Sequence, residues 1–359
     1  MSKKKQKQLI GVVIALAVVI VLLLAVMIGN IIAENAEAAA EEAAKIYVET
    51  VDDPSNLTFE SPTTEALSFT ETDDETWTYD GDSDFDLDDS TVTTIVSALE
   101  GLEATYSFTA AEELSSYGLE EPDYTLTVTD SDGNSATLYI GATSADGDYY
   151  AMLEGDSETI YTLDSTLASA MEVTLYDMAN LPSWPDLDEE NVSTFSVTGA
   201  AETTVTVASA TVEVESDDGD ASSGVEPEVT TEYYWMLDGE DITEDAFCEE
   251  LTTDLDGVSF TALAAFKPDS DALAGYGLDD PIEVYVSYES DDGEKVTVTL
   301  SVGAYSEDDD AYYCMVNGDT TCVYLCGSGD VDSFVLCAAQ GYAQAQADAE
   351  AAEEAEEEE

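Results

Sequence analysis

The sequence contains no arginine and no histidine, and its 7 lysines face 82 aspartates and glutamates, so the formal net charge is −75. Without an imidazole the chain can build neither a Ser-His-Asp triad nor a Cys-His pair, and a common zinc ligand is missing. Without arginine it lacks the bidentate clamp for phosphate or carboxylate. Because nucleic-acid binding depends on lysine and arginine that neutralise phosphates, we expect no DNA or RNA partner.

The abundant carboxylates fit two interpretations. Asp and Glu on turns and strand edges keep a surface soluble and prevent edge-to-edge association of strands. Alternating carboxylates can also supply oxygen ligands to calcium; the candidate metal ligands are Asp80, Asp82, Asp84 and Asp86. The sixth and twelfth positions counted from Asp80 lack the Gly and Glu that an EF-hand loop requires. Calcium is therefore a candidate ligand without an EF-hand, and no other cofactor is expected.

A long apolar run follows the first lysines. Residues 9–32 are long enough for a transmembrane helix, which needs about 20 residues. Four lysines lie in residues 1–8, and every acidic residue follows the run. The positive-inside rule then predicts a cytoplasmic basic N-terminus at residues 1–8 and a single-pass protein whose bulk lies outside a bacterial cell membrane. Cleavage after the small residues near Ala33 is the alternative.

Two segments rich in alanine and glutamate flank the central part of the chain. Residues 33–54 begin with strong helix formers, which predict a helical stalk that continues the membrane helix. Residues 338–359 are mostly Ala, Glu and Gln and end in four glutamates. A like-charged block of this kind is normally solvated, so we predict an acidic disordered tail.

A sequence motif occurs twice, 159 residues apart. Each copy has Tyr-Gly-Leu, two acidic residues and Pro; the members are Tyr117, Gly118, Leu119 and Pro122 in the first copy and Tyr276, Gly277, Leu278 and Pro281 in the second. Other residues repeat in the same order, among them Trp77 with Trp235 and Gly141 with Gly303. A repeat this long is a whole domain. Since prolines lie near residue 183, we expect similar modules at 55–183 and 184–337.

The repeated motif is typical of a corner between a helix and a strand. Gly118 suits the left-handed position after a helix, the leucine after it packs back on the last turn, and the proline prevents continuation. Thr109 to Glu112 form a capping-box pattern, which predicts the helix start in the first copy. Pro268 and Asp269 are expected to open the helix of the second copy.

Alternating apolar and polar residues follow each corner. They predict hairpins around the turns at 130–134 and 291–293, and further hairpins around 154–156 and 317–319. Shorter strands are expected upstream of each corner, and helical patterns cover 91–99 and 245–255. The predicted fold class is α+β, with two tandem domains dominated by antiparallel sheet and carrying short helices, after one N-terminal transmembrane helix.

Tyrosine and cysteine are the remaining candidates for chemistry. The 20 tyrosines suggest stacking on sugars, but neighbours such as Tyr149 and Tyr150 point to opposite faces of a strand, so one of each pair is expected in the core. All 5 cysteines lie in the second module. Cys314 and Cys322 flank a turn, although a disulfide needs a geometry that spacing alone does not provide. Burial as small apolar side chains is the simpler expectation.

The corner motif, the Ile140-Gly141 that ends a hairpin and the Tyr-Tyr strand, preceded by one membrane helix, resemble the bacterial family called domain of unknown function 4340. The resemblance covers roughly residues 55 to 337, and it implies no catalytic residue. Family members are associated with ABC transporters of the gliding-motility type, which implies a non-enzymatic accessory or interaction subunit that contacts permease subunits. One alternative is an extracellular binding module for cations or cell-wall glycans. Another is a hydrolase that uses two carboxylates.

Overall fold

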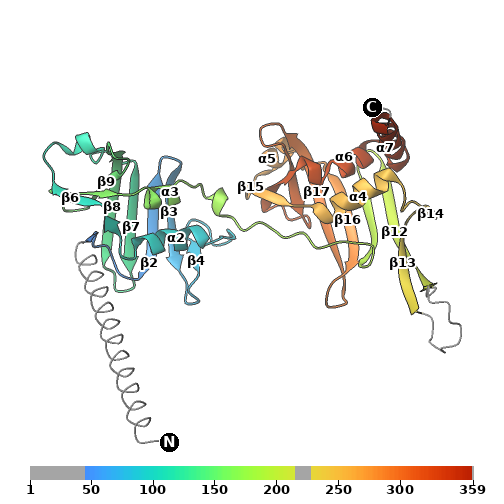
Figure 1. Cartoon of the computed structure of the whole chain (residues 1–359), viewed down its shortest axis with the longest axis horizontal. Helices are drawn as coiled ribbons and strands as arrows, with labels where there is room; N and C mark the ends of the chain where they lie inside the picture. Colours follow the sequence, from blue (N-terminus) through green and yellow to red (C-terminus); the bar gives the residue numbers. More distant parts are fainter. Residues whose placement is uncertain (1–44, 215–227, 358–359) are drawn as a thin grey trace, which may run out of the picture. The chain divides into compact units, whose positions relative to one another are not determined.

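The computed structural model describes residues 45–214 and 228–357. The predicted cytoplasmic N-terminus, the transmembrane helix and most of the stalk lie outside them. Among the helices in these two ranges, none has the length and apolar character needed to cross a membrane. The described residues form two compact units (Figure 1). Of the described residues, unit 1 comprises 45–81 and 89–173, and unit 2 comprises 82–88, 174–214 and 228–357.

Unit 1 is built on an antiparallel eight-stranded sheet with the order β4-β3-β2-β7-β8-β9-β10-β6, and β1 pairs with β5 separately. Its strands are β1 (Ile46–Tyr47), β2 (Pro54–Ser61), β3 (Thr64–Glu71), β4 (Trp77–Tyr79), β5 (Glu103–Ala104), β6 (Tyr106–Thr109), β7 (Tyr124–Asp130), β8 (Ser135–Thr143), β9 (Tyr149–Leu153) and β10 (Thr159–Leu163). Its helices are α2 (Ser90–Leu99), the 3₁₀ helix η1 (Leu114–Tyr117) and α3 (Thr166–Ala170).

Unit 2 is built on an antiparallel nine-stranded sheet with the order β14-β13-β12-β11-β16-β17-β18-β19-β15. The strands are β11 (Val192–Thr198), β12 (Glu202–Val214), β13 (Glu228–Leu237), β14 (Glu240–Asp241), β15 (Phe260–Phe266), β16 (Ile282–Glu289), β17 (Lys295–Ser306), β18 (Ala311–Val316) and β19 (Cys322–Gly327). The helices are η2 (Tyr176–Met178), α4 (Ala246–Gly257), α5 (Ser270–Gly275), η3 (Ser328–Asp330), α6 (Asp332–Gln340) and α7 (Tyr342–Glu357).

The two sheets have the same strand order when β14 is set aside. The third strand, β2, corresponds to β11, its neighbours β3 and β7 correspond to β12 and β16, and the edge strands β6 and β15 occupy equivalent positions. Trp77 in β4 and Trp235 in β13 are both buried. The structure is thus sheet-dominated and α+β, as predicted.

The four predicted hairpins are all present, as β7–β8, β9–β10, β16–β17 and β18–β19. The predicted helices at 91–99 and 245–255 are α2 and α4. Their apolar residues fall on one stripe, as helical periodicity requires. In α2 the stripe is Val92, Ile95 and Leu99. These elements could be predicted because apolar residues recur with the period of a strand or a helix.

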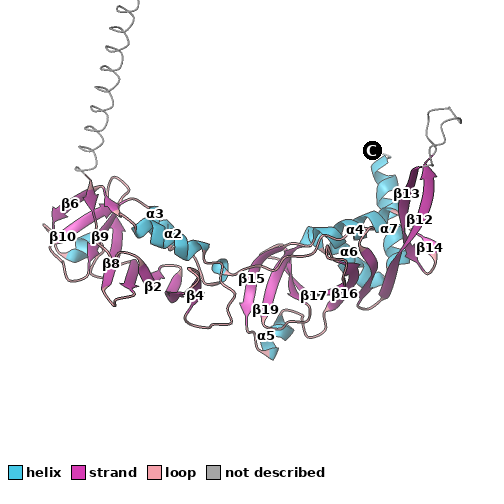
Figure 2. Ribbon diagram, turned by 90° about the horizontal axis from the view of Figure 1, so that it is seen from below, coloured by secondary structure: helices cyan, strands magenta, loops and turns pink. Residues whose placement is uncertain are grey.

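Helices cover one face of each sheet. Figure 2 shows α2 and α3 on one face in unit 1, and α4, α6 and α7 on one face in unit 2, with α5 on the opposite face. The main core of unit 2 lies under its helices and includes Phe195, Phe247 and Phe334. A second, smaller cluster contains Leu278 and Met315. The corner motif therefore packs on the face that the larger helices leave uncovered.

The predicted disordered tail is wrong for the residues described up to 357. Residues 338–340 complete α6, and α7 follows. Tyr342 and Ala345 are buried against α4, and the Gln346 side chain accepts a hydrogen bond from the backbone N–H of Phe247 at 2.9 Å. Alanine has a small apolar side chain, so the buried face of α7 produces only a weak apolar pattern in a sequence of Ala, Glu and Gln.

Two predicted boundaries also change. The described end of the stalk is not helical, because Ile46 and Tyr47 form β1 and Val48 is buried. The units divide after residue 173 and not after 183, and segment 82–88 belongs to unit 2. The backbone explains this, since Leu87 pairs with Ala179 and the N–H of Asn180 donates to the carbonyl oxygen of Asp86 at 2.9 Å.

Candidate functional site

The corner of unit 1 ends η1 with the predicted glycine. Gly118 has a φ of 70°. Its N–H donates to the Ser115 carbonyl at 3.2 Å, and the Leu119 N–H donates to the Leu114 carbonyl at 3.0 Å. This pair of bonds satisfies carbonyl groups at the end of the helix. The predicted termination of the helix at Gly118 is therefore confirmed.

The predicted start of this helix is wrong. Thr109 is the last residue of β6 and pairs with Thr159, so it caps no helix. Only a 3₁₀ turn precedes Gly118, beginning at Leu114. Pairing with β10 gives the backbone of Thr109 its hydrogen bonds, and this long-range pairing overrides the local capping pattern.

The corner of unit 2 has both predicted ends. Asp269 precedes α5, and its carboxylate accepts hydrogen bonds from the N–H groups of Asp271 and Ala272 at 3.1 and 2.9 Å. Gly277 has a φ of 69°, and the Leu278 N–H donates to the Leu273 carbonyl at 2.9 Å. The same termination thus occurs in both units.

Each corner lies against the backbone of the following hairpin, where a second glycine allows the approach. A Cβ on Gly141 would lie 2.5 Å from the Gly118 carbonyl oxygen, and one on Gly118 would lie 2.5 Å from the backbone nitrogen of Ala142. Unit 2 has the same approach, where the Ala304 N–H donates to the Tyr276 carbonyl at 2.7 Å. The repetition of Gly141 as Gly303 follows from this close contact between two backbones.

The side chains of the corner pack inward. Leu119 and Leu278 are 2% and 5% exposed. The Tyr117 ring lies edge-on to Tyr150, with ring centres 5.1 Å apart, and Tyr276 lies 4.5 Å from Tyr313. The prolines of the motif precede strands: Pro122 lies two residues before β7, and Pro281 immediately precedes β16. The arrangement supports a packing role for the tyrosines, glycines and leucines of the motif.

The paired tyrosines point to opposite faces, as predicted. Tyr150 contacts the corner through Tyr117, whereas Tyr149 lies edge-on to Tyr124 with ring centres 5.9 Å apart. In unit 2, Tyr313 contacts Tyr276 and Tyr312 contacts Tyr305. One ring of each of these two pairs therefore packs against the tyrosine of the corner motif.

The four candidate calcium ligands do not converge. Asp80 accepts hydrogen bonds from the hydroxyl groups of Ser68 and Thr70 at 2.8 and 2.7 Å. The Asn180 amide donates to Asp86 at 2.8 Å. Over residues 45–214 and 228–357, no group of three or more carboxylate, thiol or imidazole side chains is placed to hold a metal ion.

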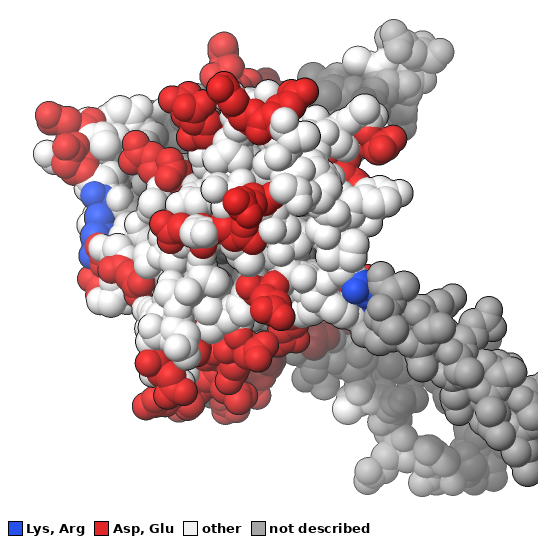
Figure 3. Space-filling model, turned by 90° about the vertical axis from the view of Figure 1, so that its left-hand side faces the viewer, with Lys and Arg blue, Asp and Glu red and all other residues white. Residues whose placement is uncertain are grey.

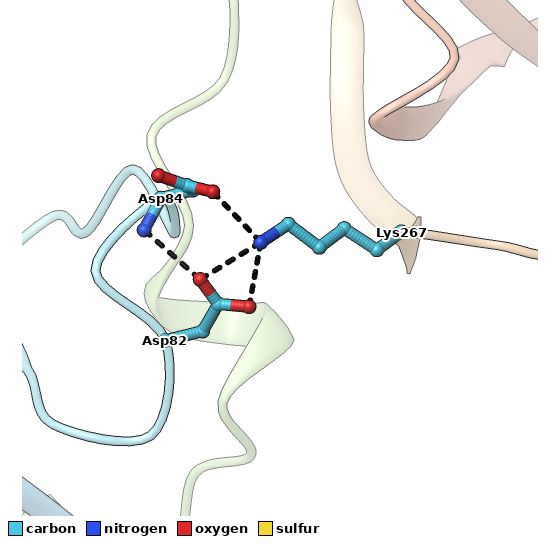
Figure 4. A network of polar contacts seen from close by, with 3 residues as sticks. All are labelled: Asp82, Asp84 and Lys267. Carbon is cyan, nitrogen blue, oxygen red and sulfur yellow. Dashed lines mark hydrogen bonds and ion pairs between the residues drawn. The ribbon is translucent and has the colours of Figure 1, made fainter.

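Asp82 and Asp84 bind a lysine of unit 2 (Figure 4). The ammonium of Lys267 lies 2.7 Å from Asp82 Oδ2 and 2.9 Å from Asp84 Oδ2. The hydrogen bond with Asp82, followed by the one with Asp84, raises the pKa of Lys267. The hydrogen bond between Lys267 and Asp82 in turn lowers the pKa of Asp82. At Asp82 and Asp84, the ammonium of Lys267 is therefore bound where a metal ion was predicted.

An aromatic contact buries one residue of the segment that carries these aspartates. Phe85 is 6% exposed and lies edge-on to Phe266, with ring centres 5.2 Å apart. Lys267 follows Phe266, and its ammonium lies 5.1 Å from the centre of that ring. Because exposed ion pairs contribute little to stability, the Phe85 contact is the stronger anchor of segment 82–88 within unit 2.

The structure brings together one carboxyl pair that the sequence did not indicate. A hydrogen bond between Asp186 and Asp256, together with their charge repulsion, raises the pKa of Asp186. Asp256 also accepts a hydrogen bond from the N–H of Leu187 at 3.0 Å. The two residues are 70 positions apart, and no local pattern relates them.

The five cysteines are thiols in the structure, and four of them are buried. Burial raises the pKa of Cys248 to about 12 and also raises that of Cys337. A thiolate is the reactive form of cysteine. These two buried thiols are therefore poorly suited to nucleophilic catalysis at neutral pH.

Acidic residues are spread over the molecular surface. On the face drawn in Figure 3, the Asp and Glu side chains lie in many separate places with uncharged residues between them. This distribution agrees with the interpretation of the acidity as a solubilising surface.

Comparison with known proteins gives one similarity. Residues 77–242 match the family model described as Domain of unknown function (DUF4340). No curated protein and no solved structure matches the chain. The matched region begins at Trp77 and ends shortly after its counterpart Trp235, so it contains strands of both units. The chain is thus similar to the family described as Domain of unknown function (DUF4340) over residues 77–242, which are less than half of its length.

Proposed function

We propose that this protein is a membrane-anchored, extracytoplasmic, non-enzymatic interaction subunit of an ABC-type transport system. In this proposal the two units are tandem copies of the domain of unknown function 4340 and dock onto permease subunits. The observation that carries it is the common strand order of the two sheets, together with the family match to residues 77–242. A duplicated domain offers two related surfaces to one partner or to two similar partners.

The anchor in this proposal is the apolar run at residues 9–32. It is long enough to span a bilayer, and the lysines before it favour a cytoplasmic N-terminus. Both units would then lie outside the cytoplasm, where they can contact the external parts of a permease.

The absence of catalysis in this proposal rests on the chemistry of the side chains. The sequence has no histidine or arginine. Burial raises the pKa of Cys248 and Cys337. Asp186 and Asp256 form a hydrogen-bonded pair and therefore leave no space for a sugar ring between two opposed carboxyl groups. These observations favour a binding role over a hydrolase.

The test is crosslinking in intact cells with the tagged full-length chain, followed by mass spectrometry of the copurified proteins. Residues 1–54 carrying the same tag provide a control for contacts made by the anchor alone. We expect permease subunits to crosslink to the full chain and not to the control. Recovery of the full chain as a lone species from gently solubilised membranes contradicts the proposal.

A binding module for wall glycans is the second candidate, and one hollow of unit 2 favours it. The hollow has a volume of about 250 Å³ and is lined by the half-buried rings of Tyr233 and Tyr288, with Asn191 and Lys295 beside them. Aromatic faces with nearby polar groups suit sugar rings. Calorimetry with soluble wall fragments tests this candidate. Tyr233→Ala should abolish binding, and Tyr106→Ala, at an exposed position in unit 1, should not.

A further inference from the structure

The β12–β13 hairpin of unit 2 is longer than its counterpart in unit 1. Strand β12 has 13 residues and β13 has 10, whereas β3 and β4 have 8 and 3. Figure 2 shows β12 and β13 continuing past β16 and β17. In this extension the side chains of Ala208, Ser209, Ala210 and Thr211 are exposed. The core that the two units share therefore does not need the extension.

One edge of this extension has no neighbouring strand. Strand β13 pairs with β12 from Val205 to Val214, whereas β11 pairs with it only from Glu202 to Thr206. Within residues 45–214 and 228–357, no other strand adjoins β12. Natural proteins usually protect an open edge with charges or proline, but residues 203–212 contain neither. An uncharged open edge in a chain with 82 acidic residues is suited to pairing with another strand.

The backbone of the extension directs hydrogen-bonding groups toward the open edge. The carbonyl oxygen of Val205 accepts a hydrogen bond from the Thr194 hydroxyl group of β11 at 2.9 Å, so the backbone groups of Val205 face β11. Backbone groups alternate between the two sides of a strand. Those of Val207, Ser209 and Thr211 therefore face the same side, where β11 no longer runs beside β12. An added strand would meet a row of donors and acceptors there.

A hollow beside this edge supplies a second, independent observation. It is the hollow of about 250 Å³ that Tyr233 and Tyr288 line, and Val207 and Ser209 also line it. Ser209 is the cross-strand partner of Tyr233, so their side chains lie on one face of the sheet. The volume is below the usual range of sites for whole small molecules and suits one long side chain. The edge and the hollow together fit an extended chain that inserts a single side chain.

We propose that this edge of β12 binds an extended segment of a partner protein by strand addition, and that one basic side chain of the segment enters the hollow. The backbone of the segment pairs with residues 207–212. Its arginine or lysine lies against the rings of Tyr233 and Tyr288, where cation–π attraction stabilises it. This inference rests on the proposed interaction role, for which it names the surface and the kind of segment bound.

The charge of the hollow favours a basic side chain. Its lining includes three glutamates, Glu189, Glu190 and Glu289, and one lysine, Lys295. Glu289 lies directly opposite Lys295 in the β16–β17 pair, so their charges offset each other. Glu189 and Glu190 then leave the hollow negative. A second copy of this chain is disfavoured as the occupant, because two chains of net charge −75 repel each other.

The test is fluorescence anisotropy of a labelled synthetic hexapeptide, made of valine and threonine with one central arginine, added to the full-length chain in detergent. We expect saturable binding to one site, and much weaker binding when glutamate replaces the arginine of the peptide. Ser209→Pro removes an N–H from the open edge and keeps the bonds to β13, which the residues on either side of Ser209 make. It should weaken binding about tenfold or more. Ser209→Ala keeps the N–H and should bind as the wild type does.

Glu189→Gln tests the hollow without changing the backbone. It should weaken binding of the arginine peptide severalfold, whereas Glu202→Gln, at the exposed other end of β12, should not. Absent or unsaturable binding of the peptide, or equal binding by Ser209→Pro and Ser209→Ala, overturns the inference. Displacement of the peptide by soluble wall fragments would make the hollow a glycan site and overturn it as well. Because the peptide assay needs no permease, its failure is distinguishable from failure of the crosslinking experiment.

Discussion

Gly118 and Gly141 meet backbone to backbone: the carbonyl oxygen of Gly118 lies where a side chain of Gly141 would begin, 2.5 Å from the position of a Cβ. Gly118 has the left-handed conformation that ends η1, and Gly141 lies in β8. The corner and the hairpin that follows it can therefore approach only because both positions lack a side chain. In unit 2 the corner and the hairpin approach one residue away: a Cβ on Gly303 would meet the carbonyl oxygen of Tyr276, and one on Gly277 would lie 2.8 Å from the backbone nitrogen of Ala304.

Gly141→Ala should destabilise unit 1 by about 2 kcal/mol, because the added methyl group must displace backbone atoms and not a flexible side chain. The measurement is urea denaturation of the full-length protein followed by circular dichroism. Gly257→Ala is the matched control, since a Cβ there has no atom within 4 Å. It should leave stability unchanged or raise it by up to about 1 kcal/mol. Equal effects at the two glycines contradict the close-packing argument.

The corners show what the sequence could predict about the candidate site and what it could not. Gly118 and Leu119 were predictable because helix termination is local and depends on a few neighbouring residues. The prediction that Thr109 caps a helix was wrong because the conformation of Thr109 depends on pairing with Thr159, 50 positions away. Local signals are reliable only where no distant strand competes for the same backbone groups.

The acidic segment shows the same limit for a binding site. The alternation of aspartates predicted a calcium ion, whereas the cation that contacts Asp82 and Asp84 is the ammonium of Lys267, 185 positions from Asp82. Phe85, which interrupts the acidic pattern, is the residue that packs the segment on unit 2. No periodicity in residues 80–89 points to Phe266 as its partner, so tertiary packing was needed to find it.

Lys267→Gln should loosen segment 82–88 while changing the stability of the whole protein little, because the ion pair is solvent-exposed. Amide hydrogen exchange measured by mass spectrometry should become faster in residues 82–88. Lys295→Gln removes the same charge elsewhere in unit 2 and should have no such effect. Unchanged exchange in the Lys267 variant would show that Phe85 and the backbone pairing of Leu87 with Ala179 hold the segment without the ion pair.

The same ion pair predicts a pH window. The pKa of Asp82 lies below the ordinary 3.8, so its stabilising effect is present above pH 3.8 and is lost as pH falls through the lowered value. The pKa of Lys267 lies above the ordinary 10.5, so its effect is present below pH 10.5 and is lost as pH rises through the raised value. In exchange rates corrected for the intrinsic effect of pH, protection of residues 82–88 should be greatest between these limits. Lys267→Gln should remove this dependence.

Tyr342→Ala should destabilise unit 2 by about 3 kcal/mol, since a buried aromatic ring is removed. The ring lies edge-on to Phe247 at 5.5 Å between centres, and its hydroxyl donates to Asp245 at 3.1 Å. Gln344→Ala, on the exposed side of α7, should change stability by less than about 0.5 kcal/mol. Differential scanning calorimetry measures both. A negligible effect of Tyr342→Ala would restore the prediction of a solvated tail.

Asp256→Asn should lower the pKa of Asp186. In the wild type, the hydrogen bond and the repulsion from Asp256 favour the protonated form of Asp186 in the folded state. The stabilisation linked to this proton is fully present below the ordinary pKa of 3.8 and is lost as pH rises through the raised folded value. An asparagine at position 256 removes the repulsion, so the variant should not lose this stabilisation as the pH rises.

The expected result at neutral pH is therefore a higher unfolding temperature for Asp256→Asn than for the wild type, with no difference at a pH well below 3.8. The asparagine oxygen can still accept the hydrogen bond from the Leu187 N–H, which preserves the local backbone. NMR titration of Asp186 checks the pKa directly. Asp291→Asn is the control, since Asp291 contributes the last and smallest of the causes that raise this pKa. If the two variants shift the pKa of Asp186 equally, long-range charge and not the carboxyl pair controls its protonation.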